Sequence, residues 1–112
     1  MDYIVHICRR RDWAKAQEGS DYRAESLETE GFIHCSRPNQ VLKVANHFYS
    51  RMGDLVLLWI DPHKLSDGVR WEDVDGDVFP HLYGVLDFQA VVSIVDFPPD
   101  PDGVFRTVPD PV

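Results

Sequence analysis

Four titratable residues lie among apolar neighbours, where a chain of this length would ordinarily place core side chains. They are His6, His34, Glu72 and His81. Imidazole and carboxylate groups in such surroundings can act as general acids and bases, or as hydrogen-bonding groups for a ligand. A histidine within a strand can equally be a core residue that donates one nitrogen to a backbone carbonyl, so both interpretations stay open for His6.

His34 begins a polar segment, because Ser36, Arg37 and Gln40 follow it at a junction between an expected strand and an expected helix. Free amides at the start of a helix can receive an anion such as a phosphate. The Arg37 guanidinium adds further donors, so the segment predicts a ligand-binding site. In the alternative interpretation, Ser36 and Gln40 only cap the helix.

Glu72 directly follows Trp71 in the sequence. A carboxylate against an aromatic wall can have a raised pKa, or it can face positive charge that develops during a reaction. Acidic residues continue at positions 73, 75 and 77, so a solvated acidic hairpin is the competing interpretation.

The segment 79–84 reads Phe-Pro-His-Leu-Tyr-Gly. Its proline restrains φ, and its glycine gives the backbone conformational freedom where the segment ends. These features predict that His81 and Tyr83 project from a shaped loop. His47 and His63 have no comparable setting, and we expect both on the surface.

The first third of the chain predicts two short elements and a loop. Side chains alternate in character over 3–8, which is typical of a strand. Asp12 can cap a helix of under two turns over 13–18, with Gly19 as its stop. Residues 20–30 carry acids without clear periodicity, so we expect a loop that can act as a lid.

A short strand over 32–35 and a helix that begins at Pro38 and stops at Gly53 are predicted next. The helix is supported by one apolar stripe: Val41, Ala45, Phe48 and Met52. The continuous apolar run 55–60 indicates a strand covered on both faces, at the centre of a sheet.

The second half of the chain consists mainly of expected strands. Asp75-Gly76 suits a tight hairpin turn between strands over 69–72 and 77–79. Residues 85–97 provide one long or two short strands. Helices in the first half and strands in the second predict an α+β fold with a largely antiparallel sheet.

The chain has 112 residues, the size of one ordinary domain. We expect a globular domain over 1–97, followed by a tail or strap over 98–112 that is rich in proline and aspartate. Cys8 and Cys35 have no metal-binding spacing, and we expect each to pack as a small apolar side chain.

The formal net charge of −8 disfavours general binding to nucleic acid. The longest apolar run has six residues, far short of the roughly twenty that a membrane-spanning helix needs. The N-terminus has no basic leader followed by an apolar stretch, so we expect a cytoplasmic protein that does not associate with membranes. Nothing in the sequence indicates an oligomeric state.

Three motifs, taken in order, resemble a family of small bacterial and plant proteins, domain of unknown function 952 (DUF952). They are Gly-Phe-Ile-His-Cys-Ser at 31–36 with Gln40, Trp-Glu at 71–72, and Phe-Pro-His-Leu-Tyr-Gly at 79–84. The match extends from the first strand to Val95. This family is in turn remotely similar to the ADP-ribosyltransferase superfamily.

The superfamily resemblance implies a curved, split antiparallel sheet with flanking helices. It implies NAD as cofactor, held in a cleft between two small sheets. Nicotinamide would leave C1 of its ribose through an oxocarbenium-like state that a carboxylate stabilises. The expected activities are therefore ADP-ribosyl transfer and NAD glycohydrolysis.

Carried onto this sequence, the resemblance gives residues definite roles. The catalytic candidates are Glu72, His34 and His81; the candidates for binding the nucleotide are His6, Ser36, Arg37, Gln40 and Tyr83. His6 matches a position that contacts a ribose hydroxyl, and Glu72 is the nearest candidate for the catalytic acid. The superfamily usually brings its glutamate from a late strand, where this chain has Gln89, so a binding module for an ADP-ribose-like ligand is also open.

Two further interpretations use other chemistry. His34, His81 and Glu72 could hold a divalent metal for hydrolysis, since three such ligands suffice for catalytic zinc. The chain lacks the local histidine pairing of many metal motifs, so we rank this below nucleotide binding and expect no metal. A non-enzymatic interaction domain, whose polar motifs stabilise its own loops, is the third interpretation.

Overall fold

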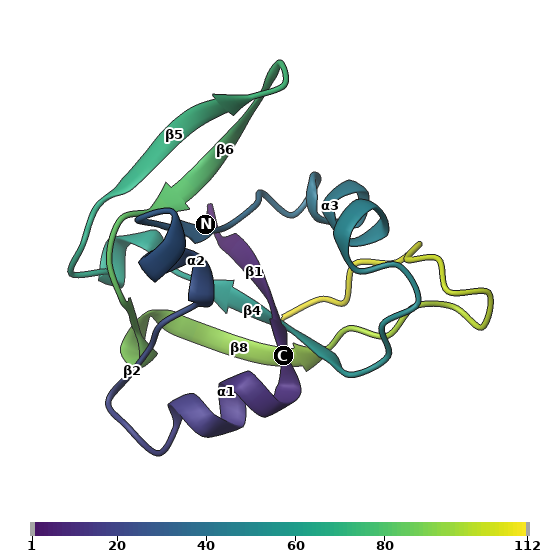
Figure 1. Ribbon diagram of the computed structural model, residues 1–112, viewed down its shortest axis with the longest axis horizontal. Helices are drawn as coiled ribbons and strands as arrows, with labels where there is room; N and C mark the ends of the chain where they lie inside the picture. Colours follow the sequence, from purple (N-terminus) through teal and green to yellow (C-terminus); the bar gives the residue numbers. More distant parts are fainter. Residues whose placement is uncertain (1, 112) are drawn as a thin grey trace.

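The computed structural model describes residues 2–111 and has an α+β fold in which short helices alternate with strands (Figure 1). Every strand pairing among these residues is antiparallel. The elements are β1 (Ile4–Arg9), α1 (Arg10–Ala16), β2 (Asp21–Tyr22), α2 (Glu25–Thr29), β3 (Ile33–His34), α3 (Val41–Phe48), β4 (Leu55–Ile60), β5 (Val69–Val74), β6 (Asp77–Leu82), β7 (Leu86–Asp87) and β8 (Val91–Asp96). Single 3-10 turns lie at Pro62–Lys64 and Phe88–Ala90.

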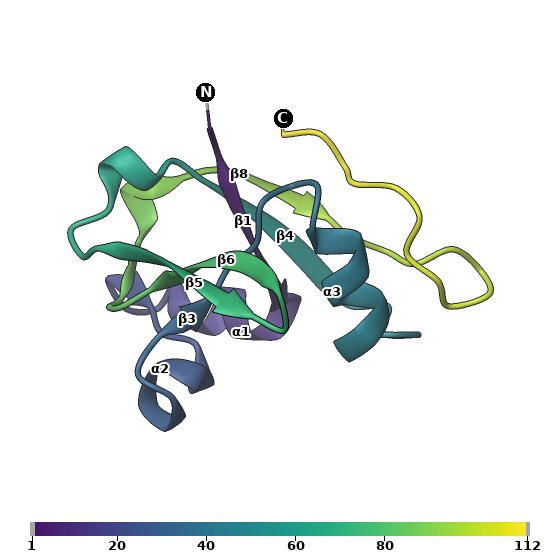
Figure 2. The same cartoon turned by 90° about the horizontal axis from the view of Figure 1, so that it is seen from above.

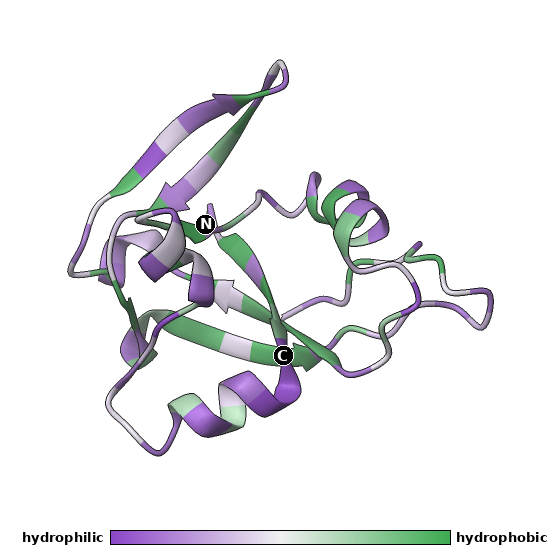
Figure 3. Ribbon diagram, viewed as in Figure 1, coloured by the Kyte–Doolittle hydropathy of each residue, from purple (hydrophilic) through white to green (hydrophobic). Residues whose placement is uncertain are grey.

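The first sheet has the order β1-β4-β8, and β4 lies at its centre as predicted. All six residues of β4 are buried, because one set of alternate side chains packs on each face of the sheet. Leu58 belongs to a core shared with Trp13 of α1, while Leu57 belongs to a core shared with Val41 of α3. Figure 3 shows how strongly apolar residues concentrate in this sheet.

The second sheet has the order β3-β6-β5. Its β5–β6 hairpin turns at Asp75 and Gly76, which have φ angles of 52° and 86°. Such left-handed conformations suit aspartate and glycine, so the hairpin predicted from this dipeptide is confirmed. In Figure 1 the hairpin extends away from the first sheet. A third, two-stranded sheet pairs β2 with β7.

The two larger sheets meet at an isolated bridge between Val5 and Ser36. The backbone amide of each residue donates to the carbonyl of the other at 2.8 Å. Beyond this bridge β1 continues along β4, while β3 pairs with β6. The strands therefore form a split antiparallel arrangement, and the wedge between β1 and β3 opens at the bridge.

Helices α1 and α3 pack on opposite faces of the first sheet (Figure 2). Helix α1 follows β1 without a break and begins at Arg10, so the prediction that Asp12 caps it is wrong; Asp12 lies in its first turn. The predicted loop over 20–30 is also wrong. It contains β2 and α2, whose lengths of two and five residues are too short to give a periodic pattern.

Helix α3 is shorter than predicted. It begins at Val41 rather than Pro38, and it ends at Phe48 rather than near Gly53. Val41 and Ala45 are buried, but Phe48 is 70% exposed, and it is Tyr49 rather than Phe48 that packs against the same core. The position of His81 also differs from the prediction, since β6 continues to Leu82 and includes His81 instead of ending before a loop.

Residues 98–111 form no helix or strand, and they return along α3. Asn46 of α3 exchanges two hydrogen bonds with the backbone of Phe105, whose ring is buried against Phe97. The domain predicted over 1–97 begins at Met1 and the tail predicted over 98–112 ends at Val112. These two terminal residues lie outside the described residues. No helix within residues 2–111 is long and apolar enough to cross a membrane.

Candidate ligand cleft and histidine–carboxylate cluster

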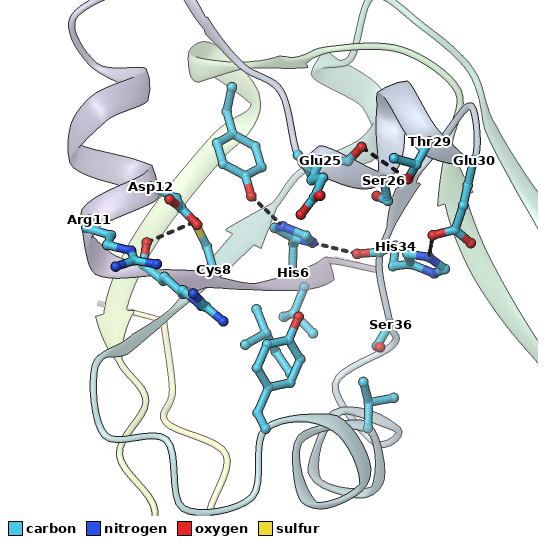
Figure 4. A pocket seen from close by; sticks show the side chains of 17 residues that line it. His6, Cys8, Arg11, Asp12, Glu25, Ser26, Thr29, Glu30, His34 and Ser36 are labelled. Atoms are coloured by element: carbon cyan, nitrogen blue, oxygen red, sulfur yellow. Dashed lines mark hydrogen bonds and ion pairs between the residues drawn. The ribbon is translucent and has the colours of Figure 1, made fainter.

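A cavity of about 500 Å³ lies at the wedge where β1 and β3 separate (Figure 4). Side chains from β1, α1, α2 and β3 line it. Its polar lining includes His6, Arg9, Arg11, Asp12, Glu25, Ser26, Thr29, Glu30, His34 and Ser36. Three of the predicted site residues, His6, His34 and Ser36, are thus brought to one cavity.

His6 is 6% exposed and occupies the inner wall of this cavity. Its Nδ1 faces the His34 carbonyl, which can only accept, so Nδ1 carries the proton. Its Nε2 then accepts from the Tyr22 hydroxyl at 3.1 Å. Burial lowers the pKa of His6 to about 4, so the ring is neutral at pH 7. The hydrogen bonds of His6 are therefore those expected of a core histidine that donates to a backbone carbonyl. Its ring also borders the cavity.

His34 is the residue shared by the cavity and the second sheet. Its side chain is about half exposed, and its Nε2 lies 3.1 Å from a carboxylate oxygen of Glu30. On the other side its ring centroid lies 5.5 Å from that of His81, its partner in the β3–β6 register. Since paired residues of neighbouring strands project from the same face, His34 and His81 are side by side as predicted.

Glu72 connects three polar side chains in the second sheet. Its Oε1 accepts from the Tyr83 hydroxyl at 2.6 Å and from His81 Nδ1 at 2.8 Å. These two hydrogen bonds stabilise the carboxylate form and lower the pKa of Glu72, with Tyr83 as the larger cause. The same contact raises the pKa of Tyr83. Glu72 is therefore ionised at neutral pH.

The prediction that Trp71 forms an aromatic wall for Glu72 is wrong. Consecutive residues of a strand project to opposite faces, and the Trp71 ring is 51% exposed on the face away from Glu72. The side chains against Glu72 are instead His81 and Tyr83, which lower its pKa where an apolar wall would raise it. In the competing interpretation the acidic hairpin is solvated, and Asp73 and Asp75 are indeed exposed.

Phe32 packs in the middle of this cluster. Its ring stacks on His81, with centroids 4.1 Å apart and an interplanar angle of 20°. It also meets His34 edge-on at 4.8 Å and Tyr83 at 5.2 Å. Arg70 closes the far side, with its guanidinium carbon 4.4 Å from the Tyr83 ring centroid. The cluster thus runs continuously from the cavity to the outer strand of the sheet.

Arg37 and Gln40 lie outside the cavity lining. Gln40 is buried; its Oε1 accepts from the Arg37 amide at 2.9 Å, and its Nε2 donates to the Val78 carbonyl at 2.8 Å. It therefore fastens the turn before α3 to β6. The capping alternative is wrong for both candidates, because no side chain within residues 2–111 caps α3. The Arg37 guanidinium points to Asp77, 3.6 Å away.

Reasoning from sequence missed Tyr22, Phe32, Glu30 and Arg11. Tyr22 and Glu30 lie in the segment 20–30, which was predicted to be a loop that can act as a lid, and Arg11 lies beside Asp12, which was considered only as a helix cap. Phe32 shares a strand face with His34 in the predicted alternation, which was the available signal that it would share the site.

Cys8 and Cys35 are buried, as expected, and burial raises the pKa of their thiols to about 11 and about 12.

No group of three histidine, cysteine or acidic side chains within residues 2–111 is arranged to hold a metal ion. The proposed metal set of His34, His81 and Glu72 does not converge, because His34 Nε2 faces Glu30 and His81 Nδ1 faces Glu72. The arrangement is one of hydrogen-bonded acid–base pairs. Metal-assisted hydrolysis therefore has no support from this geometry.

Residues 7–94 match the protein family described as "Protein of unknown function (DUF952)". The chain belongs to the DUF952 family. Protein CC0527 from Caulobacter crescentus has a similar structure in crystals, with 30% sequence identity, a TM-score of 0.85 and coverage of 93% of each chain. Its solution NMR structure is similar too, with 31% identity, a TM-score of 0.80, and 95% of this chain and 93% of that chain covered. No curated protein matches. This chain and protein CC0527 therefore have similar folds over nearly their full lengths.

Proposed function

We propose that this DUF952 protein binds an ADP-ribose-containing nucleotide, with NAD as the expected ligand, in the wedge between β1 and β3. The observation that carries the proposal is the cavity of about 500 Å³ at the point where the two sheets separate. Ligand sites of roughly 300 to 1,000 Å³ are typical for small molecules and cofactors. His6, His34 and Ser36 at the inner end are the residues that the sequence singled out for this ligand.

The polar lining suits the two halves of such a ligand. Arg9 and Arg11 border the cavity, and neither makes an ion pair or side-chain hydrogen bond with another residue in 2–111. Uncommitted guanidinium groups are well suited to a pyrophosphate, since they donate to it in a bidentate way. Glu25, Glu30 and His34 supply acceptors for ribose hydroxyls. The lining also carries the carboxylates of Asp12, Glu25 and Glu30, so the two guanidinium groups are the cationic groups proposed to meet the pyrophosphate.

The proposed reaction is cleavage of the bond between nicotinamide and C1 of the ribose, with water or another hydroxyl as acceptor. Glu72 is the carboxylate expected to stabilise the oxocarbenium-like charge. Two features support this role: its lowered pKa keeps it ionised, and its Oε2 makes no hydrogen bond with another residue in 2–111. Glu72 and His81 are not among the residues that line the cavity; the contact between the His34 and His81 rings is what links them to it.

Thermal unfolding with NAD, ADP-ribose and AMP tests the binding step. A ligand at 100 times its Kd stabilises the folded chain by about 2.7 kcal/mol, so the Tm should rise with the logarithm of ligand concentration. Chromatographic detection of nicotinamide tests the chemistry separately. No Tm shift with any of the three nucleotides up to millimolar concentration would exclude the proposal, whereas binding without nicotinamide release would leave a nucleotide-binding module.

A further inference from the structure

We propose that the protein has a second small-molecule site, separate from the wedge, that binds a planar aromatic carboxylate. The site is a cavity of about 470 Å³, within the range of roughly 300 to 1,000 Å³ that is typical of small-molecule sites. The lining residues that carry the argument are Asp2, Tyr3, Arg37, Asn39, Trp59 and Trp71. No residue that lines this cavity also lines the wedge cavity, so the inference does not depend on the proposed function.

Three aromatic side chains form the apolar walls of this second cavity. Tyr3, directly before β1, meets Trp59 of β4 edge-on, with ring centroids 6.2 Å apart and an interplanar angle of 84°. Trp71 of β5 contributes the third ring and is 51% exposed, although Pro80, its partner in the hairpin register, is buried. Aromatic rings attract one another in stacked and edge-on arrangements. A half-exposed tryptophan that lines a cavity therefore favours a flat aromatic ligand.

The turn that carries Arg37 and Asn39 is fixed in place within the fold. Gln40 accepts from the Arg37 amide at 2.9 Å and donates to the Val78 carbonyl of β6 at 2.8 Å. These two hydrogen bonds tie the turn to the β5–β6 hairpin, which also carries Trp71. A site whose parts are already ordered loses less conformational entropy when it binds a ligand.

Arg37 determines the charge of the expected ligand. Its guanidinium carbon lies 6.0 Å from the centroid of the Trp71 ring, and its ion-pair partner, Asp77, is 3.6 Å away. A guanidinium group that is held this loosely can form two hydrogen bonds to a carboxylate. The ring that carries this carboxylate would then lie against Trp71. The Asn39 amide also lines the cavity.

A cationic ligand is the alternative, because Asp2 is exposed and lines the same cavity. Ammonium ligands bind over the faces of aromatic rings. The Arg37 guanidinium already lies over the Trp71 ring, so a second cation at that face would be repelled. The arrangement therefore favours an anion. It also gives one shared ligand to Arg37 and Trp71, which the wedge cavity leaves out.

Three probes that share one ring system and differ in charge test this assignment on the full chain. They are naphthoate, naphthamide and naphthylmethylammonium, each substituted at the same ring carbon. Isothermal titration calorimetry should give naphthoate the lowest Kd, at least about tenfold below that of the ammonium probe. Ammonium binding as tight as that of naphthoate would overturn the inference, and so would no binding of naphthoate up to millimolar concentration.

Variants of the two exposed residues separate the charge from the aromatic wall. Arg37→Gln should raise the Kd of naphthoate by about tenfold and leave that of naphthamide within about threefold. Trp71→Ala should raise the Kd of both probes, because it removes the ring on which they stack. Arg23→Gln and Phe48→Ala change exposed residues outside the cavity lining and should bind like the unchanged chain. Unchanged naphthoate affinity in Arg37→Gln would contradict the proposed carboxylate contact.

The indole N–H signals of the three tryptophans locate the probe by NMR. The Trp59 N–H is the one fully buried side-chain polar atom within residues 2–111 that has no hydrogen-bond partner. Trp13 belongs to the core on the α1 side and is the internal control, since it does not line this cavity. Naphthoate should shift the signals of Trp59 and Trp71 and leave that of Trp13 in place. A larger shift at Trp13 would place the probe elsewhere and overturn the inference.

Discussion

His6 and His81 are almost equally buried, at 6% and 5% exposure, but they have different partners. His6 donates to a backbone carbonyl and accepts from a tyrosine hydroxyl, so both of its nitrogens are used within the fold. His81 donates to a carboxylate and has its second nitrogen uncommitted. Burial alone therefore does not distinguish a structural histidine from one available for chemistry. The partners of its two nitrogens do, and replacing those partners tests the distinction.

The largest effect is expected at the carboxylate partner of His81. Glu72→Gln keeps an acceptor for His81 and Tyr83 but removes the negative charge, so nicotinamide release should fall by about 100- to 1,000-fold. The Kd for ADP-ribose should stay within about threefold, because the charge acts in the transition state. Product assays and calorimetry measure the two quantities. Equal turnover in the variant would remove Glu72 from the mechanism.

The second prediction concerns pH and His6. Its pKa is about 4 in the folded chain and 6.5 ordinarily, so between these values the unfolded chain binds a proton that the folded chain does not. The free energy of unfolding should therefore decrease as the pH falls from 6.5 towards 4, by about 3 kcal/mol in full. Urea unfolding at several pH values measures this.

His6→Gln provides the control for the pH experiment, since glutamine does not titrate. The variant should lose the decrease between pH 6.5 and 5, a range above the ordinary pKa of glutamate, 4.5. Below that range, carboxylates with lowered pKa such as Glu72 and Asp102 also contribute in both proteins. An unchanged slope in His6→Gln would mean that another group carries the pH dependence.

The third prediction concerns His34, which links the two regions. Replacing it with alanine should weaken ADP-ribose binding by about 1 to 3 kcal/mol, as expected when a polar contact is lost. His63 is exposed and outside the cavity lining, so His63→Ala should bind like the unchanged chain. Isothermal titration calorimetry measures both. Similar affinities for the two variants would contradict a role for His34 in the cleft.

The smallest effect is expected from removing a single hydroxyl. Tyr22→Phe leaves the buried Nε2 of His6 without a donor, and should destabilise the fold by about 1 to 2 kcal/mol. Tyr83→Phe leaves a partly exposed carboxylate that water can solvate, and should cost less than about 0.5 kcal/mol. Chemical unfolding measures the loss of unfolding free energy in each variant. Comparable losses in the two variants would contradict the difference between the surroundings of His6 and those of His81.

The elements predicted well from sequence are those whose signal is local. The continuous apolar run of β4 and the Asp75-Gly76 turn each determine a backbone conformation through neighbouring residues only. Strand β2 was missed because it is two residues long and pairs with β7, more than sixty positions later. Phe48 was misplaced because α3 faces the core with Val41, Ala45 and Tyr49, a stripe that leaves Phe48 on the exposed side.

The candidate site was predicted in part for the same reason. His34 and His81 each interrupt an apolar pattern, which marks them individually, and their register then brings them together. Tyr22 and Phe32 act only through tertiary contacts with histidines of the site, which no local pattern reports. The error at Trp71 had a different origin, since adjacency in sequence was taken for adjacency in space along a strand.

The position of β4 also governs how the chain can fold during synthesis. Leu57 pairs with Ile7, fifty positions earlier, and with Val95, near the end of the chain. At about 5 to 20 residues per second, the apolar strand β1 waits roughly 3 to 10 seconds on the ribosome before its partner has been made. The β5–β6 hairpin needs no such wait, because its strands are neighbours. Among the six-residue strands, β1 is therefore the one that stays longest without its partner and is open to wrong pairing in the cell during that time.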